Sequence, residues 1–328
     1  MNVLVYDVAA ESGGAASILE YYYAIHAKEK QNRYIYLLST YHLEDTDNIT
    51  VINEPSIKKS WAHRLYYDYV GSKKILKKYK IDQVLSLQNL RLPAFKGEQT
   101  IYVHNALPFC EYHFGIFEDS KMWIYQNIIG RLMYGSIKRA DKVIVQTDWM
   151  KEAIIQKCKI KDKVEVSFPK VFIPEDVSYN GGTGKCFFYP ANEAKFKNHK
   201  VIIEASKILI DSGYKDFEIV FTLTGQENDN ISTIRREAEE HNIRVRWEGM
   251  LPRDEVFAWY TKSILIFPSY IETIGLPIYE AMQVGTPIIV TNCKYAQSIS
   301  EGYANKKSFD YNNAKQLAEI MIATCRGV

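Results

Sequence analysis

The sequence predicts an α/β protein with two doubly wound, Rossmann-like domains. Two observations carry this prediction. The chain has 328 residues, which exceeds what one hydrophobic core usually holds, so two domains of about 150 residues are expected. Short β-branched strand candidates also alternate with helical patterns, and the alternation starts afresh after the polar, glycine-rich segment 178–184.

The first series of elements predicts an N-terminal domain over residues 1–175. A buried strand at residues 3–6 leads through a Gly-Gly turn into a helix at about 16–28. Further strand candidates follow at residues 34–38, 83–87, 100–103 and 142–145. This order is typical of βαβ units on a parallel sheet.

The second series predicts a C-terminal domain over residues 185–310. Its strand candidates are residues 186–189, 218–223, 264–267 and 287–290, with helices such as 202–212 and 233–241 between them. Residues 311–328 are expected to form a last helix, for which a return to the N-terminal domain is one option.

Composition and charge exclude several classes of protein. Hydrophobic residues make up 47% of the chain and charged residues 24%, as in ordinary globular proteins, and the net charge of +2 gives no global reason to expect nucleic acid. The first residues lack the basic segment of a signal peptide, and no apolar run approaches the roughly 18 residues of a spanning helix. Five scattered cysteines, with no C-x-x-C pair, favour a reducing cytoplasm.

The most informative stretch of the sequence follows the strand candidate 264–267. Ligands of open α/β sheets bind at the carboxyl ends of strands. Gly275 lets the backbone approach a ligand, Pro277 suits the first turn of a helix, and Gly285 suits its end. The free N–H groups near residues 274–276 are therefore expected to form an anion site for a diphosphate.

Two glutamates flank this expected anion site. Glu280 lies one turn inside the helix and should lean back toward its N-terminus, where a carboxylate can accept both hydroxyls of a ribose. Glu272, in the loop at the strand end, can accept hydroxyls of a sugar beyond the diphosphate. The alternative is that both glutamates only complement the helix dipole, a contribution of about 0.3–1 kcal/mol each.

At this point the sequence resembles the group 1 glycosyltransferases, the retaining family 4 enzymes of the GT-B architecture. The shared motif is P-S-x-x-E-x-x-G-L-P-x-x-E-A-M, with its glutamates at Glu272 and Glu280. Residues 102–108, 140–150 and 187–199 resemble other segments of the family. The resemblance implies two Rossmann-like domains that face each other across a cleft, the first for the acceptor and the second for a nucleotide sugar.

The resemblance also implies roles for individual residues. Glu272 would hold donor-sugar hydroxyls, Glu280 the ribose, and backbone N–H groups of Ile274, Gly275 and Leu276 the phosphates. Lys197 matches the family's phosphate-binding lysine, whose charge would stabilise the departing diphosphate; the alternative is an ordinary surface lysine. Where many relatives carry an arginine, this chain has Ala191, and Lys195 is the candidate substitute.

Two sites in the N-terminal domain complete the expected set. His104 follows a strand candidate, and the resemblance places it beside the donor sugar; a structural histidine that caps a turn is the alternative. Gly13 and Gly14 resemble the family's first loop, which closes on donor phosphate and acceptor, although a Gly-Gly turn alone is a weak signal.

The sequence also contains a formal metal motif. Asp45-Thr46-Asp47 has the D-x-D spacing of the other glycosyltransferase architecture, but it lies in a polar loop far from the nucleotide-sugar motif. We interpret it as turn chemistry. Since the GT-B resemblance implies no metal, we expect no cofactor beyond the nucleoside diphosphate sugar.

A basic and aromatic stretch runs between Lys58 and Lys80. It carries eight basic residues against one acid, Asp68, with apolar residues interleaved. Such a stretch is typical of a membrane-surface element and would suit a polyprenyl-diphosphate-linked acceptor. Ordinary helices with lysines in solvent are the main alternative, and nucleic acid is a third that no recognition motif supports. The apolar side chains that we expect on this surface are Trp61, Leu65, Tyr66, Tyr69, Ile75 and Leu76, with Trp123, Ile124, Tyr125, Ile128, Ile129, Leu132 and Met133 as a second set.

Taken together, the sequence predicts a retaining glycosyltransferase that moves a sugar from a nucleoside-diphosphate sugar to a hydroxyl of a glycan or lipid-linked acceptor. Family frequency favours a uridine diphosphate donor and a role in cell-surface polysaccharide synthesis, such as O-antigen or lipopolysaccharide, at the cytoplasmic face of the membrane. Alternatives are an inverting transferase, a sugar-nucleotide epimerase, or a pseudo-transferase subunit that binds without turnover.

Overall fold

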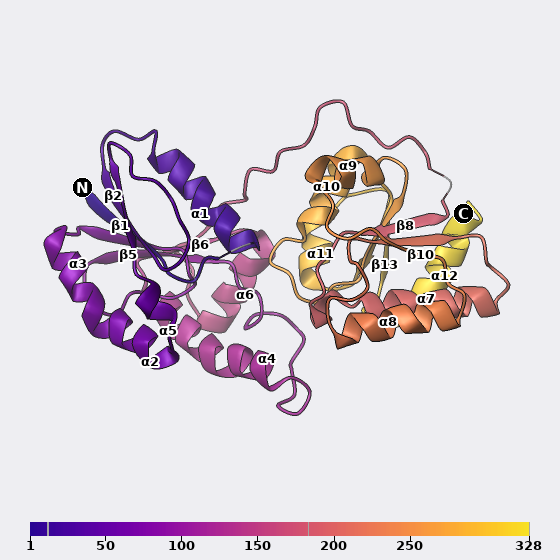
Figure 1. Cartoon of the computed structure of the whole chain (residues 1–328), viewed down its shortest axis with the longest axis horizontal. Coiled ribbons are helices and arrows are strands. Elements are labelled where there is room, and N and C mark those ends of the chain that lie inside the picture. The colour runs from indigo at the N-terminus through magenta and orange to yellow at the C-terminus, as the bar shows by residue number, and fades with distance from the viewer. Residues whose placement is uncertain (12, 183, 328) are drawn as a thin grey trace. The chain divides into compact units, whose positions relative to one another are not determined.

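The computed structural model describes residues 1–11, 13–182 and 184–327, and it divides the chain into two compact units, Met1–Pro169 and Lys170–Val328. The segment 178–184, where the sequence predicts a linker, thus lies inside the second unit, shortly after the division, and its Thr183 is outside the described residues. Each unit holds its own parallel sheet with helices packed around it (Figure 1).

The N-terminal unit contains a seven-stranded sheet in the order β3-β2-β1-β4-β5-β6-β7, and all its strand pairs are parallel. The direction of winding reverses between β1 and β4. The strands are β1 Asn2–Asp7, β2 Arg33–Leu38, β3 Ile49–Asn53, β4 Gln83–Ser86, β5 Glu98–Val103, β6 Lys142–Val145 and β7 Val164–Val166.

Two long helical segments of this unit each contain a π-helical turn. The first joins α2, η2 and α3, and the second joins α4, η3 and α5. Ile75 and Leu76 pack against the core and Met133 is buried, so these three do not belong to the exposed apolar surface that the sequence predicts. The helices are α1 Gly13–His26, η1 Pro55–Lys58, α2 Trp61–Tyr66, η2 Tyr67–Gly71, α3 Ser72–Lys78, α4 Ser120–Ile124, η3 Tyr125–Ile129, α5 Gly130–Arg139 and α6 Asp148–Cys158.

The C-terminal unit contains a six-stranded parallel sheet in the order β10-β9-β8-β11-β12-β13, which reverses between β8 and β11. All four residues of β11 and of β12 are buried, as expected of inner strands covered on both faces. The strands are β8 Cys186–Tyr189, β9 Glu218–Phe221, β10 Val245–Trp247, β11 Ile264–Phe267, β12 Ile288–Thr291 and β13 Lys306–Phe309.

The last helix packs on α7 and therefore lies with the C-terminal unit, unlike the return to the N-terminal domain considered above. Its apolar side chains Leu317, Ala318 and Met321 are buried. The helices of this unit are η4 Lys195–Lys197, α7 His199–Asp211, α8 Asp229–Glu240, α9 Arg253–Tyr260, α10 Leu276–Val284, α11 Lys294–Ile299 and α12 Ala314–Cys325.

The strands that the sequence predicts are present, and four others are not predicted by it. These four, β3, β7, β10 and β13, are the edges of the two sheets. Three of them have three or four residues, and β13 reads Lys-Lys-Ser-Phe with only Phe309 buried. Edge strands bury less of their surface, and the sequences of β7, β10 and β13 lack the apolar run that marks an inner strand, whereas β3 has such a run.

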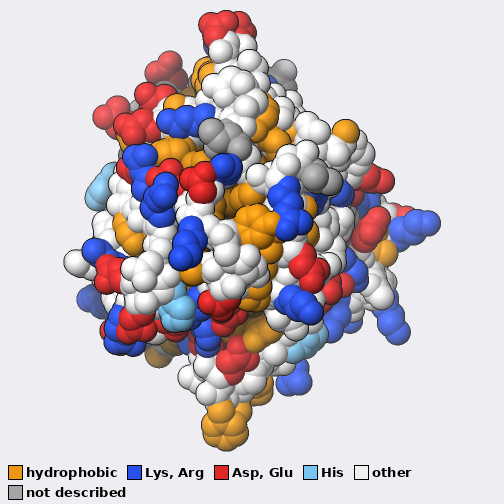
Figure 2. Space-filling view, turned by 90° about the vertical axis from the view of Figure 1, so that its right-hand side faces the viewer, with side chains coloured by type: hydrophobic (Ala, Val, Ile, Leu, Met, Phe, Trp, Pro, Cys, Tyr) orange, Lys and Arg blue, Asp and Glu red, His pale blue; other side chains and the backbone are white. Residues whose placement is uncertain are grey.

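The surface carries charges of both signs. On the face shown in Figure 2, Lys and Arg side chains are interspersed with Asp and Glu, in keeping with the net charge of +2. Within the described residues, no helix combines the length and the apolar character that crossing a membrane requires.

Two histidines are buried in the cores, His26 in the N-terminal unit and His199 in the C-terminal unit. Burial lowers the pKa of His26 to about 4 and that of His199 to about 3, the latter with help from the charge of Lys197. Both side chains are therefore neutral at pH 7. Their contribution to stability is present above the unfolded pKa near 6.5 and is lost as the pH falls toward the folded value.

We predict that His199→Gln flattens the acid dependence of stability. Wild-type protein should lose about 1–2 kcal/mol of unfolding free energy through His199 alone between about pH 7 and pH 5, and the variant should lack this part of the slope. Urea unfolding at several pH values measures it, and His241→Gln, at an exposed position, is the control. Equal slopes in His199→Gln and wild type would contradict the prediction.

Candidate functional site

The candidate site lies where the C-terminal sheet reverses its winding, at the carboxyl ends of β8 and β11. Ligands of open α/β sheets bind at such switch points. Lys197, from the loop after β8, and Glu272, from the loop after β11, form an ion pair across this point, and both side chains are 16% exposed. The ammonium also lies 5.9 Å from the ring centre of Phe267, the last residue of β11. The switch point thus brings together two of the predicted site residues.

Hydrogen bonds fix the two loops against each other. The N–H of Tyr270 donates to the carbonyl of Phe196 over 3.1 Å, and the Ser269 hydroxyl donates to the same carbonyl over 3.3 Å. The carbonyl of Ser269 in turn accepts from the hydroxyls of Thr291 and Tyr295, over 3.1 and 2.5 Å. Since Ser269 is fully buried, Glu272 projects from a rigid base.

Gly275 turns the chain from this loop into α10. Its φ of +76° lies in the left-handed region, and a Cβ here would come within 3.1 Å of the Tyr295 ring, so a larger residue would be strained. Among the described residues, the N–H groups of Ile274, Gly275 and Leu276 donate no hydrogen bond. Pro277 in the first turn has no N–H to satisfy. These N–H groups at the helix start can bind an anion.

Glu280 is buried, with only 6% of its surface exposed, and has two partners from α9. Arg253 pairs with its Oε1 over 2.8 Å, and the Tyr260 hydroxyl donates to its Oε2 over 3.2 Å. Burial raises the pKa of Glu280, while the charge of Arg253 opposes this shift. Arg253 and the Tyr260 hydroxyl stabilise the ionised form, in which the carboxylate can accept further hydrogen bonds.

Arg253 was not among the residues that the sequence predicts for the site. It is the first residue of α9, its side chain is 51% exposed, and it also donates to the carbonyl of Phe172 over 2.9 Å. No local motif marks it, because it lies 27 positions before Glu280 and meets it only through helix packing. The sequence offers only a weak signal for Arg253, namely an arginine without a predicted role six residues after β10.

The other predicted residues of the C-terminal unit lie near the same loop. Lys195 is exposed at the start of η4 and makes no ion pair with a described residue. Ala191 binds Thr222 through its N–H over 3.1 Å and supplies no charge. Among the described residues of this loop, Lys195 is thus a cation without an ion-pair partner.

The predicted residues His104, Gly13 and Gly14 lie in the N-terminal unit. The ring Nε2 of His104 lies 3.0 Å from the carbonyl of Leu87 and 3.3 Å from the side-chain amide nitrogen of Asn89. Burial lowers the pKa of His104 to about 4. Gly13 begins α1, and a Cβ at Gly14 would meet nothing within 4 Å. Space does not therefore require glycine at position 14.

The D-x-D segment has a local role. Asp45 accepts a hydrogen bond from the N–H of Val51 in β3 over 2.8 Å, and the N–H of Thr46 donates to the carbonyl of Ile49 over 3.0 Å. These bonds hold the turn before β3, as the interpretation of this segment as turn chemistry requires.

We predict that Arg253→Met destabilises the protein and makes its stability more dependent on pH. Without the guanidinium, Glu280 is a buried carboxylate without a cation, so its pKa rises further. Stability is then lost as the pH rises through that value, and the cost should reach about 1–3 kcal/mol at pH 8 and shrink near pH 5. Urea unfolding at both pH values measures this. Arg236→Met, in an exposed pair with Glu240, should change stability by about 0.5 kcal/mol or less. A cost that does not depend on pH would contradict the prediction.

Comparison with known proteins agrees with this architecture. Residues 176–325 match the family model of the glycosyl transferases group 1. An uncharacterized glycosyltransferase of Haemophilus influenzae is 21% identical over 190 residues, which are 57% of this chain, and the match spans about half of that relative, 52%.

Solved structures extend the similarity to both units. WaaG, a glycosyltransferase involved in lipopolysaccharide biosynthesis, superposes with a TM-score of 0.71 over 99% of this chain and 90% of its own, at 14% identity. HepE of Anabaena, solved with UDP and glucose, gives a TM-score of 0.68 over 98% and 89%, also at 14% identity. Residues 176–325 thus match the group 1 glycosyl transferases, and the chain has the two-domain GT-B fold.

Proposed function

We propose that this protein is a retaining glycosyltransferase that uses a nucleoside diphosphate sugar, with a uridine diphosphate donor as the first choice. The observation that carries the proposal is the set of free N–H groups at the start of α10, flanked by Lys197–Glu272 on one side and by Glu280 on the other. A diphosphate at these N–H groups would leave Glu280 to bind ribose hydroxyls and Glu272 to bind sugar hydroxyls.

The proposed chemistry needs charge stabilisation more than a reactive side chain. As the bond between the sugar and the diphosphate breaks, negative charge grows on the diphosphate. Lys197 and the start of α10 would stabilise that charge. A diphosphate oxygen would take the proton of the acceptor hydroxyl on the face it leaves, which retains the configuration. His104, neutral because of burial, would contact the donor sugar through its ring or carbonyl.

The choice of uridine diphosphate rests on a structural relative. HepE of Anabaena has been solved with UDP and with UDP-glucose. For this chain we propose a glycan or a lipid-linked sugar as acceptor and a role in cell-surface polysaccharide synthesis, because WaaG is involved in lipopolysaccharide biosynthesis. The proposal needs no metal, because N–H groups and Lys197 carry the positive field.

One experiment separates this proposal from its alternatives. Release of nucleoside diphosphate is measured with a panel of sugar donors, with and without a chelator, and the anomeric configuration of the product is read by NMR. A retained configuration supports the proposal. An inverted product, an epimerised donor, or binding without release would instead identify an inverting transferase, an epimerase or a pseudo-transferase.

We predict that the two glutamates differ in their effect on nucleotide binding. Glu280→Ala should weaken binding of free UDP about tenfold or more, since two ribose hydroxyls lose a charged partner. Glu272→Ala should change UDP affinity less than threefold and lower turnover instead. Calorimetry with UDP and the donor assay test both, with Glu240→Ala, on the exposed end of α8, as control. Equal losses of UDP affinity in both variants would rule out the assignment.

A second proposal concerns the membrane. The helices between Trp61 and Lys78 expose a set of large apolar side chains beside a set of exposed lysines. The first set is Trp61, Leu65, Tyr66, Tyr69 and Val70, between 48% and 63% exposed, and the second is Lys73, Lys74, Lys77 and Lys78. Exposed aromatic rings beside lysines match the chemistry of an anionic lipid surface. We propose peripheral binding at the cytoplasmic face of the membrane.

Two basic residues of this stretch have internal partners. Arg64 pairs with the buried Asp68 over 2.9 Å, and Lys58 pairs with Glu11. They hold the helices in place and are poor candidates for lipid contact. A second apolar set comes from the helical segment around α4 and α5, where Phe117 is fully exposed and Ile116, Ile124, Ile128 and Leu132 are about half exposed.

We predict that the protein co-sediments with vesicles that contain acidic lipid and much less with neutral vesicles. Binding should fall with rising salt, because exposed charges are screened over about 8 Å at physiological ionic strength. Replacement of Lys73, Lys74, Lys77 and Lys78 by glutamine should abolish sedimentation and spare transfer to a short soluble acceptor.

A control variant distinguishes local from overall charge. Replacement of four exposed lysines elsewhere, Lys161, Lys200, Lys215 and Lys315, removes the same charge and should leave vesicle binding nearly intact. Equal loss in the control, or binding that ignores lipid charge, would contradict membrane contact through this surface.

A further inference from the structure

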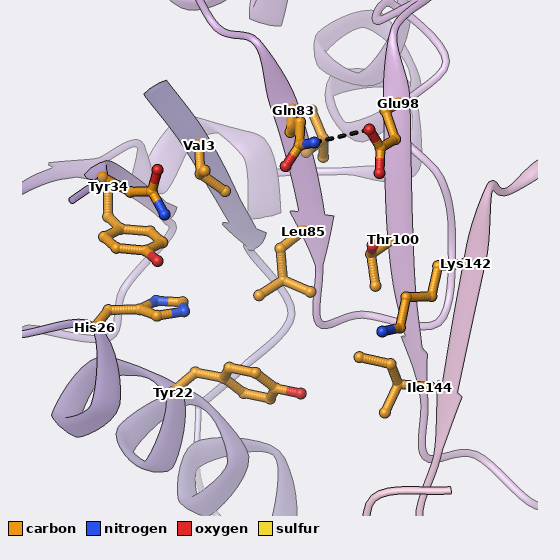
Figure 3. A pocket seen from close by; sticks show the side chains of 12 residues that line it. Val3, Tyr22, His26, Tyr34, Gln83, Leu85, Glu98, Thr100, Lys142 and Ile144 are labelled. Carbon is orange, nitrogen blue, oxygen red and sulfur yellow. Dashed lines mark hydrogen bonds between the residues drawn. The ribbon is translucent and has the colours of Figure 1, made fainter. Parts of the chain in front are cut away.

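A pocket of about 230 Å³ opens on the α1 side of the N-terminal sheet (Figure 3). Its lining includes Gln83, Glu98 and Lys142, the first residues of β4, β5 and β6. The pocket therefore lies toward the amino ends of the strands. The carboxyl ends, where ligands of such sheets bind and where His104 and Gly13 lie, are at the opposite edge.

The pocket has an aliphatic floor and an aromatic wall. Leu85 and Ile144 project from the sheet as the floor. Tyr22, His26 and Tyr34 form the wall, and the rings of His26 and Tyr34 stack with centroids 3.7 Å apart (Figure 3). The ring of Tyr22 is in turn held edge-on by Tyr102, at 5.8 Å. The wall is thus a fixed surface that suits the flat apolar face of a ring.

Three polar groups at the pocket have no hydrogen-bond partner among the described residues. They are the Tyr22 hydroxyl, the Thr100 hydroxyl and the Nε2 of His26, whose Nδ1 already lies 2.7 Å from the hydroxyl of Tyr36. The Tyr22 hydroxyl and the His26 ring are directed into the pocket (Figure 3). Unpaired hydroxyl and imidazole groups that converge on one space are typical of a site that orients a ligand.

The polar groups at the rim already have partners. The amide of Gln83 donates to the Glu98 carboxylate over 2.7 Å, and Lys142 pairs with Glu165 over 2.6 Å. His26 is neutral at pH 7 because burial lowers its pKa to about 4. The pocket therefore offers no unpaired cation to a phosphate, and its free groups suit neutral hydroxyls.

We propose that this pocket binds one sugar unit, a neutral hydroxylated ring, apart from the donor site. The apolar face of the sugar would lie on the aromatic wall, and its hydroxyls would meet Tyr22, His26 and Thr100. The volume of about 230 Å³ is below the roughly 300–1,000 Å³ of pockets for drug-sized ligands, so a single ring fits better than an oligosaccharide. The inference holds whether or not the chain transfers sugar.

Saturation-transfer NMR on the full chain tests the proposal. The probes are methyl glucoside, methyl galactoside and N-acetylglucosamine, with uridine and inorganic phosphate as contrasting ligands. At least one of the sugars should bind, and it should shift the ring signals of His26. Uridine or phosphate binding at His26 without any sugar, or no binding at all, would overturn the proposal.

Conservative variants locate the binding. Tyr22→Phe and Thr100→Val each remove one hydroxyl and should weaken sugar affinity about threefold to tenfold. Tyr23→Phe, on the same helix, removes a hydroxyl that donates to Glu44 outside the pocket and should change nothing. Unchanged affinity in both pocket variants would overturn the assignment.

One further variant separates this site from the donor site. Glu272→Ala should keep the sugar affinity of the wild type, because Glu272 lies in the other unit. If that variant loses sugar binding and Tyr22→Phe retains it, the sugar occupies the donor site and the pocket proposal fails, while the transferase proposal stands.

Discussion

The parallel pairing of the strands constrains where this protein can place polar chemistry. In the C-terminal unit the inner strands β11 and β12 are covered on both faces and expose no residue. A charged side chain in the middle of such a strand would be buried without water. The polar groups of the candidate site therefore lie beyond strand ends, where Lys197 and Glu272 follow β8 and β11. The pocket of the N-terminal unit uses the other ends, with Gln83, Glu98 and Lys142 at the starts of their strands.

The same constraint explains how much of the fold the sequence predicts. Inner strands such as β11 and β12 are buried along their whole length, so they stand out as short runs of mostly apolar and β-branched residues. The edge strands are not buried in this way: β13 buries only Phe309 and β10 buries none of its three residues. The buried face of a helix is harder to predict than a strand, because in a helix with apolar residues on more than one face either face can pack on the core. Ile75 and Leu76 are expected on the surface and instead pack on the core, in the helix that follows a π-helical turn.

The candidate site divides along similar lines. Glu272, Gly275 and Glu280 belong to one continuous segment, so their spacing alone predicts a loop, a helix start and an inward carboxylate. Tyr295, which supports the loop through Ser269, and Arg253, which pairs with Glu280, come from other helices. Contacts of this kind depend on tertiary packing, and a single sequence contains no local pattern for them. A sequence motif therefore predicts the residues that contact a ligand better than it predicts the residues that hold those ligand-binding residues in place.

Each of the two carboxylates is paired with a cation, and this explains how a site with two glutamates can suit an anion. A bare carboxylate about 4 Å from a diphosphate oxygen would repel it by about 4 kcal/mol at an effective dielectric constant of 20. Here Glu272 is paired with Lys197 and Glu280 with Arg253, so the negative charge of each carboxylate is balanced by a neighbouring cation. The N–H groups at the start of α10 then add a positive potential that no carboxylate cancels. In this arrangement Arg253 supplies a second cation to the site, on a different element from Ala191. The absence of an arginine at that position therefore need not leave the site with excess negative charge.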